Sequence, residues 1–76
     1  MEQITKKMAF VRKAYRKGVL MGVLSSPSEC GSMDSTLWRW NHNEGKPNDV
    51  FIESNVDRSS GIVVLRVKKL RKEVKV

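Results

Sequence analysis

Apolar residues in the first part of the chain recur every three or four positions, which is the spacing of one face of a helix. The positions of this stripe are Ile4, Met8, Val11, Ala14 and Tyr15. The basic residues fall largely outside it, and Thr5 is a candidate N-cap. The pattern predicts an amphipathic helix over residues 4–17.

From residue 18 onward the pattern is ambiguous. Gly18 and Gly22 continue the helical spacing, but each weakens a helix by about 1 kcal/mol relative to alanine. The aliphatic run Val19–Leu24 therefore either extends the helix or forms a strand after it. Both alternatives stay open at this point.

Turn and capping residues fill the segment 25–35. Ser26 before Pro27 predicts an N-cap followed by proline at the first helical position, so a short helical turn begins there. Asp34 or Ser35 is the candidate cap of a second helical piece that carries the two tryptophans.

The second half of the chain predicts a hairpin. Residues 41–49 are a loop, and the run Val50–Asn55 that follows is a short strand. Asp57–Gly61 is a turn, and Ile62–Val67 is the strongest strand signal because of its β-branched residues. Beyond it, residues 68–76 either continue the strand half-exposed or form a flexible basic tail.

These elements predict one α+β domain over residues 1–76, with an N-terminal amphipathic helix, short helical pieces and a C-terminal antiparallel hairpin. A chain of this length buries only about 60% of its unfolded surface, so its core is thin and a homodimer remains open. The alternative is a small β-barrel of the SH3 or OB type. Its strands would be Val19–Leu24, Thr36–His42, Val50–Asn55 and Ile62–Lys69.

The chain offers little for catalysis. Cys30 is the only cysteine and His42 the only histidine, so neither an intrachain disulfide nor a Cys/His zinc cluster can form. A nucleophile–base pair of these two residues is the one such arrangement available, but a buried cysteine and a solvated histidine are far commoner. A glycine-rich phosphate loop is absent from the sequence. We expect a protein that is not an enzyme and has no cofactor or metal.

A lone thiol suits a reducing compartment, and no stretch approaches the roughly 18 consecutive apolar residues of a membrane span. We therefore expect a cytoplasmic protein without a membrane partner. The basic helix itself has three interpretations: a solvated face, a row of phosphate contacts, or a membrane-surface helix anchored by Phe10 and Tyr15.

The formal net charge of +7 is distributed unevenly along the chain. Residues 1–24 carry a net +5, residues 25–60 a net −3, and residues 61–76 a net +5. Such a basic balance is a general signal for binding a polyanion. Because both ends are basic, we expect both to contact phosphates, through Arg12, Lys13, Arg16, Lys17, Lys68, Lys69, Arg71 and Lys72.

The meaning of the two tryptophans depends on the backbone. In a helix, Trp38 and Trp40 point about 200° apart, so one packs in the core with Leu37 and the other lies on the surface with Arg39. In a strand they share a face and form a stacking platform for single-stranded bases.

The stretch from Gly31 to Trp40, followed by the apolar residues from Val50, resembles the turn, recognition helix and exit of phage excisionase and AlpA-type winged helix-turn-helix regulators. The matching positions are Gly31, Ser35, Thr36, Leu37 and Trp40. The resemblance implies that Gly31 makes the turn, that Leu37 and Trp40 anchor the recognition helix, and that residues 50–67 form the wing. It also implies that Ser35, Thr36 and Arg39 face the major groove and that Arg58 sits at the wing tip.

We expect a nucleic-acid-binding protein, with DNA favoured over RNA, that acts as a small regulator or accessory factor. Thr36, Arg39 and Arg58 would supply any specificity. The alternative is a non-enzymatic adaptor or inhibitor that docks on an acidic protein surface. A nucleic-acid binder should keep its acidic residues away from the footprint, whereas an adaptor can use both signs of charge. The acids that decide this are Glu44, Asp49, Glu53 and Asp57.

Overall fold

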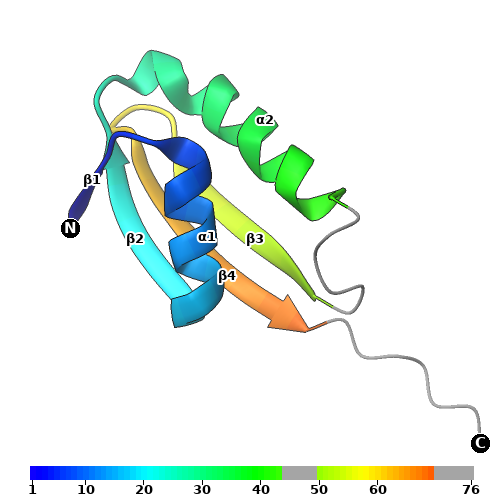
Figure 1. Ribbon diagram of the computed structural model, residues 1–76. Coiled ribbons are helices and arrows are strands. Elements are labelled where there is room, and N and C mark those ends of the chain that lie inside the picture. Colours follow the sequence, from blue (N-terminus) through cyan, green and yellow to red (C-terminus); the bar gives the residue numbers. More distant parts are fainter. Residues whose placement is uncertain (44–49, 70–76) are drawn as a thin grey trace, which may run out of the picture.

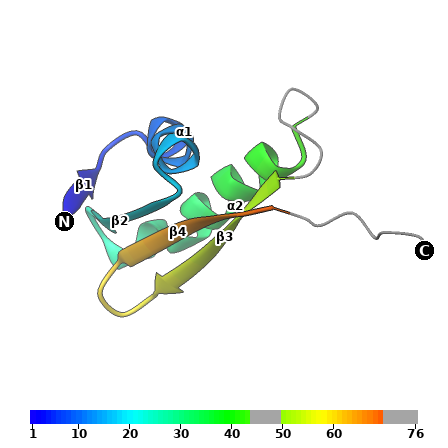
Figure 2. The same ribbon diagram turned by 90° about the horizontal axis from the view of Figure 1, so that it is seen from below.

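The computed structural model describes residues 1–43 and 50–69, which form a four-stranded sheet covered on one face by two α-helices (Figures 1 and 2). The expectation of an α+β fold is confirmed. In chain order the elements are β1 (Glu2–Ile4), α1 (Lys7–Lys17), β2 (Val19–Leu24), a 3-10 turn (Pro27–Glu29), α2 (Cys30–Asn41), β3 (Val50–Asp57) and β4 (Ile62–Lys69). The strand order is β1-β2-β4-β3; β1 is parallel to β2, and the other neighbours are antiparallel. The barrel alternative is wrong, because this sheet is open and residues 36–41 are helical.

Helix α1 is shorter than the sequence predicts. Ile4 is not its first apolar residue but the buried end of β1, where it pairs with Leu24. The N-cap is Lys6 rather than Thr5, and it makes no side-chain capping bond. Residue 4 is in a strand and not in the helix, because pairing with β2 satisfies its backbone hydrogen-bonding groups while its side chain still reaches the core.

Gly18 decides the ambiguity of the segment that follows α1. Its φ of +91° is strained for other residues, and its N–H donates to the carbonyl of Ala14 at 2.8 Å, which closes the last helical turn. Its own carbonyl accepts from the N–H of Val67 in β4 at 2.8 Å. The chain therefore enters the sheet at once, and Val19–Leu24 is a strand.

The second helix begins earlier than expected. The Ser26 side chain accepts from the N–H of Ser28, and Pro27 opens the 3-10 turn, as the sequence predicts. That turn runs directly into α2, so the helix needs no new cap, and the predicted start at Asp34 or Ser35 is wrong. One initiation site serves both pieces.

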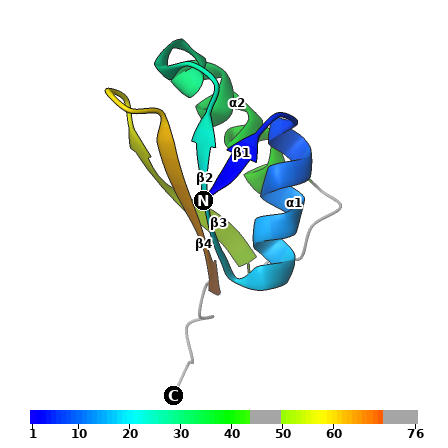
Figure 3. The ribbon, with the colours of Figure 1, turned by 90° about the vertical axis from the view of Figure 1, so that its left-hand side faces the viewer.

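The hairpin is confirmed. Strands β3 and β4 pair from Val50 opposite Lys69 to Asp57 opposite Ile62. At the turn the N–H of Gly61 donates to the carbonyl of Asp57 at 2.8 Å. Figure 3 shows the hairpin lying beside β2 within the sheet, and α1 and α2 on one face of that sheet.

The core lies between the sheet and the two helices. Its members are Ile4, Phe10, Val11, Ala14, Leu24, Cys30, Met33, Leu37, Trp40, Val50, Ile52, Val63 and Leu65. Gly22 permits the closest approach within it, since a Cβ there would stand 2.7 Å from Phe10 Cε1 and 2.8 Å from Ile4 Cγ1. The Phe10 ring therefore packs directly on the backbone of β2.

We expect Gly22→Ala to lower the free energy of unfolding by about 1–3 kcal/mol, because overpacking forces the Phe10 ring or the strand to move. Urea unfolding followed by circular dichroism measures the change. Gly31→Ala is the matched control, since its added Cβ meets no atom within 4 Å and alanine favours the helix. Equal destabilisation by both substitutions would contradict the close-approach explanation.

Candidate nucleic-acid interface

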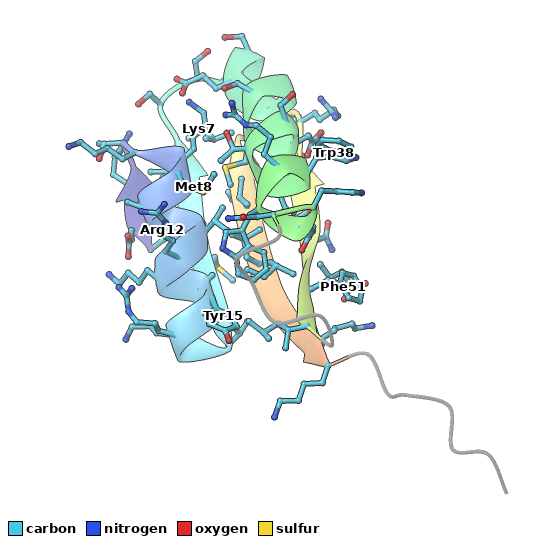
Figure 4. The ribbon with its side chains drawn as sticks, turned by 45° about the vertical axis from the view of Figure 1, so that its right-hand side comes forward. Lys7, Met8, Arg12, Tyr15, Trp38 and Phe51 are labelled. Atoms are coloured by element: carbon cyan, nitrogen blue, oxygen red, sulfur yellow. The ribbon has the colours of Figure 1, made fainter. Side chains whose placement is uncertain are left out.

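The outer face of α1 carries cations that have no acidic partner in the described part of the chain. Arg12 and Arg16 lie one helical turn apart and are exposed, as are Lys6 and Lys17 at the two ends of the helix (Figure 4 labels Arg12). Within residues 1–43 and 50–69 none of these four side chains forms an ion pair. Lys6 was missed as a candidate, although it belongs to the same basic run.

Two other cations of this region are neutralised locally. Lys7 Nζ lies 2.9 Å from Glu29 Oε1, and Lys13 Nζ lies 2.8 Å from Glu2 Oε1. Lys13, which the sequence predicts to contact phosphate, is thus already paired with a carboxylate of β1. These pairs also engage the acids nearest to α1.

Helix α2 adds one further cation and small hydroxyl groups to the same layer. Arg39, Ser32 and Ser35 are exposed on its outer side, and Arg39 has no ion pair in the described part of the chain. Thr36 is different: it is 5% exposed, and its hydroxyl donates to the carbonyl of Ser32 at 2.9 Å. The prediction that Thr36 faces a base is wrong, because Thr36 lies on the same face of α2 as the buried residues Met33, Leu37 and Trp40.

The acids of the chain's middle lie elsewhere. The odd-numbered positions of β3, which include Glu53 and Asp57, point to the sheet face that no helix covers. Asp34, on α2, pairs with Arg58 at 2.6 Å across to the hairpin turn. The helix layer is therefore net positive. Of the described strand acids, Glu53 and Asp57 lie on the opposite side of the molecule, whereas Glu2 of β1 pairs with Lys13 of α1. Glu44 and Asp49 lie outside the described residues.

Two of the described C-terminal cations, Arg66 and Lys68, lie on a different face from the cations of α1. Lys68 lies on the uncovered sheet face, with its Nζ 3.4 Å from Glu53 Oε1, and Arg66 is exposed on that same face. Lys69 ends β4 and is exposed. Arg71 and Lys72 lie outside the described residues. The prediction that Lys68 contacts phosphates therefore concerns a different face of the molecule from that of α1, because strand alternation turns this side chain away from the helices.

The two tryptophans separate as the helical alternative requires. Trp40 is 6% exposed, and its ring contacts that of Tyr15 at 5.3 Å. Trp38 is 61% exposed and stacks on His42 at 4.0 Å with an interplanar angle of 21°. The alternative in which Trp38 and Trp40 form a shared stacking platform is wrong, since the two side chains lie on opposite sides of α2.

The segment that resembles a winged helix-turn-helix has a different local course. Gly31 lies in the first turn of α2 instead of in a turn between helices, and strand β2 precedes the 3-10 turn. Leu37 and Trp40 are both buried. Arg58 sits at the tip of the β3–β4 hairpin, in the ion pair with Asp34.

The alternative chemistries can be placed as well. Cys30 is buried at the first residue of α2 and His42 is exposed beyond its last, about 18 Å along the helix, so they form no pair. Among the described residues, no three of His, Cys, Asp or Glu are grouped to hold a metal ion, and no helix is long and apolar enough to cross a membrane. Phe10, one of the two anchors in the membrane-surface interpretation of the basic helix, is in the core.

Comparison with models of known protein families, with characterised proteins and with solved structures finds no match to this chain. The distribution of charge over the two faces is thus the observation from which a function is inferred.

Asp57 offers a test of the electrostatics at the hairpin turn. Its carboxylate accepts from the Ser59 hydroxyl at 2.7 Å and from the Ser59 N–H at 3.0 Å, and these bonds lower the pKa of Asp57 below its ordinary value of 3.8. The resulting stabilisation is present above that ordinary value and is lost as the pH falls through the lowered one.

We expect Asp57→Asn to be less stable than the original chain at about pH 6, and the difference in stability to be smaller at about pH 2. Urea unfolding at both values measures this difference. A gap that persists unchanged at low pH would show that the charge of Asp57 does not stabilise the turn.

Proposed function

We propose that the helix layer binds nucleic acid by contacting its phosphates. The footprint consists of Lys6, Arg12, Arg16 and Lys17 on α1 and Arg39 on α2. The observation that carries the proposal is the uneven distribution of charge among the described residues: the helix layer exposes cations without acidic partners, while on the uncovered sheet face Glu53 and Asp57 are balanced by Arg66 and Lys68. That is the arrangement expected of a nucleic-acid binder and not required of an adaptor.

The energetics follow from the state of these cations in the unbound protein. An exposed arginine with no carboxylate partner breaks no ion pair when it binds a phosphate. The phosphate then releases its condensed counterions. Five such contacts give a slope of log K against log salt of about −4.5 for duplex DNA. Ser32 and Ser35 add hydroxyl donors to the same surface. These contacts position the chain on a phosphate backbone and do not by themselves read sequence.

DNA is the polymer we propose, in a cytoplasmic setting that agrees with the lone buried thiol of Cys30. A role as a small regulator or accessory factor is part of the same proposal. Duplex DNA, single-stranded DNA and RNA of equal length are compared directly in the experiment below.

We expect the double substitution Arg12→Gln/Arg16→Gln to weaken DNA binding and to reduce the magnitude of the salt slope by about 2, since each lost phosphate contact removes about 1. Fluorescence anisotropy with a labelled duplex over a range of salt concentrations measures both effects.

The matched control is Arg66→Gln/Lys68→Gln, which removes the same charge from the uncovered sheet face. We expect it to leave the slope nearly unchanged. If both double variants reduce binding equally, net charge and not the helix layer is responsible. If no polymer binds at low salt and an acidic protein survives nuclease treatment in a pulldown, the adaptor alternative is favoured.

A further inference from the structure

The free edge of the sheet at β3 exposes backbone groups. The Asn41 side chain donates to the carbonyl of Ile52 at 3.0 Å and accepts from its N–H at 2.8 Å. The backbone of Ile52 therefore points away from β4. Because the pointing direction alternates along an antiparallel strand, the N–H and C=O of Ser54 and Val56 also point to the open edge. Within the described residues these groups have no backbone partner.

A groove of about 380 Å³ runs along this edge between α2 and β3. Its lining includes Trp38, the most exposed ring of α2, and Ser54 from the open edge. Phe51 belongs to the same lining, and Figure 4 shows Trp38 and Phe51 on the side of the molecule away from α1. The groove thus combines an apolar wall with unpaired backbone groups.

The charged residues that line the groove are Asp34 and Glu53, both acidic. Each lies in an exposed ion pair, with Arg58 and Lys68 respectively. Exposed ion pairs of this kind contribute little to stability, so each carboxylate is able to bind an additional cation. The described lining of the groove supplies these two carboxylates and no cation, so a basic segment complements it better than a polyanion does.

We propose that this groove binds an extended basic peptide of a partner protein, which adds to the sheet as a strand beside β3. Four backbone hydrogen bonds join the peptide to Ser54 and Val56. Side chains of an added strand alternate between the two faces of the sheet. Those on the helix side lie against Trp38 and those on the other side reach Glu53, so the preferred peptide alternates apolar and basic residues.

Asn41 sets the limit of the added strand. Its amide occupies the edge groups of Ile52, so backbone pairing of the peptide with β3 stops before that residue. This surface is separate from the cations of α1, so peptide binding and DNA binding are independent properties of the chain.

The test uses the full chain and a labelled peptide, acetyl-(Lys-Val)₃-amide, with fluorescence anisotropy as the readout. N-methylation at alternate residues of the peptide removes donors from one edge only. We expect methylation on one set of alternate positions to weaken binding by about tenfold or more, and methylation on the other set to have little effect. Equal effects of both sets, or no binding of the parent peptide, would overturn strand addition.

Protein variants check the two walls of the groove. Trp38→Ala and Glu53→Gln should each weaken binding several-fold, while Glu29→Gln, which removes the same charge near α1, should leave it unchanged. Protection of the Ser54 and Val56 amides from hydrogen exchange should appear only with peptide. A single-stranded oligonucleotide that displaces the peptide from the groove would overturn the choice of a protein partner.

Discussion

The close approach of Phe10 to the backbone of β2 is the contact on which the rest of the arrangement depends. Gly22 leaves room for the ring, because any Cβ there would stand within 2.8 Å of Phe10 or Ile4. Because α1 lies this close to the sheet, its apolar face is buried in the core, and Arg12 and Arg16 on its other face are exposed to solvent. The same packing places α2 beside α1, so that Tyr15 contacts Trp40 and both helices cover one face of the sheet.

Because both helices cover the same face of the sheet, the charged side chains are divided between a helix layer and an uncovered sheet face. Strand alternation sends Glu53, Asp57 and Lys68 to the face without helices, while the helix layer exposes cations whose nearby acids are engaged in ion pairs. A chain whose basic and acidic segments alternate in sequence therefore becomes a molecule with one net positive layer. The proposed DNA contact rests on this separation and not on the total charge.

The β3 edge is the second consequence of the same architecture. As the last strand of an open sheet it has one unpaired side, and natural proteins usually protect such edges. Here Asn41 protects only Ile52, and α2 stands back far enough to leave a groove beside Ser54. The two proposed surfaces thus lie on different sides of α2 and use different chemistry, charge on one and backbone pairing on the other.

Much of the fold was predictable from local patterns. Helical spacing predicted α1 apart from its first turn, Ser26 and Pro27 predicted the turn before α2, and β-branched residues around Gly61 predicted the hairpin. The candidate cations Arg12, Arg16, Lys17 and Arg39 were also named from sequence, and the structure places all four in the helix layer. The orientations of Lys68 and Thr36 did not follow from the sequence, because they depend on which face of β4 meets the helices and on which face of α2 packs on the core.

The sequence by itself determined which segments could be helical or extended and how much charge each carries, since both are properties of neighbouring residues. Only the tertiary structure decided that Val19–Leu24 is a strand, because that choice depends on pairing with β4, whose partner residues, from Arg66 opposite Val19 to Ile62 opposite Val23, are far away in the sequence. It also decided the contact of Asn41 with Ile52 and the separation of charge between two faces. Those features arise from burial and pairing between distant segments, which no local pattern encodes.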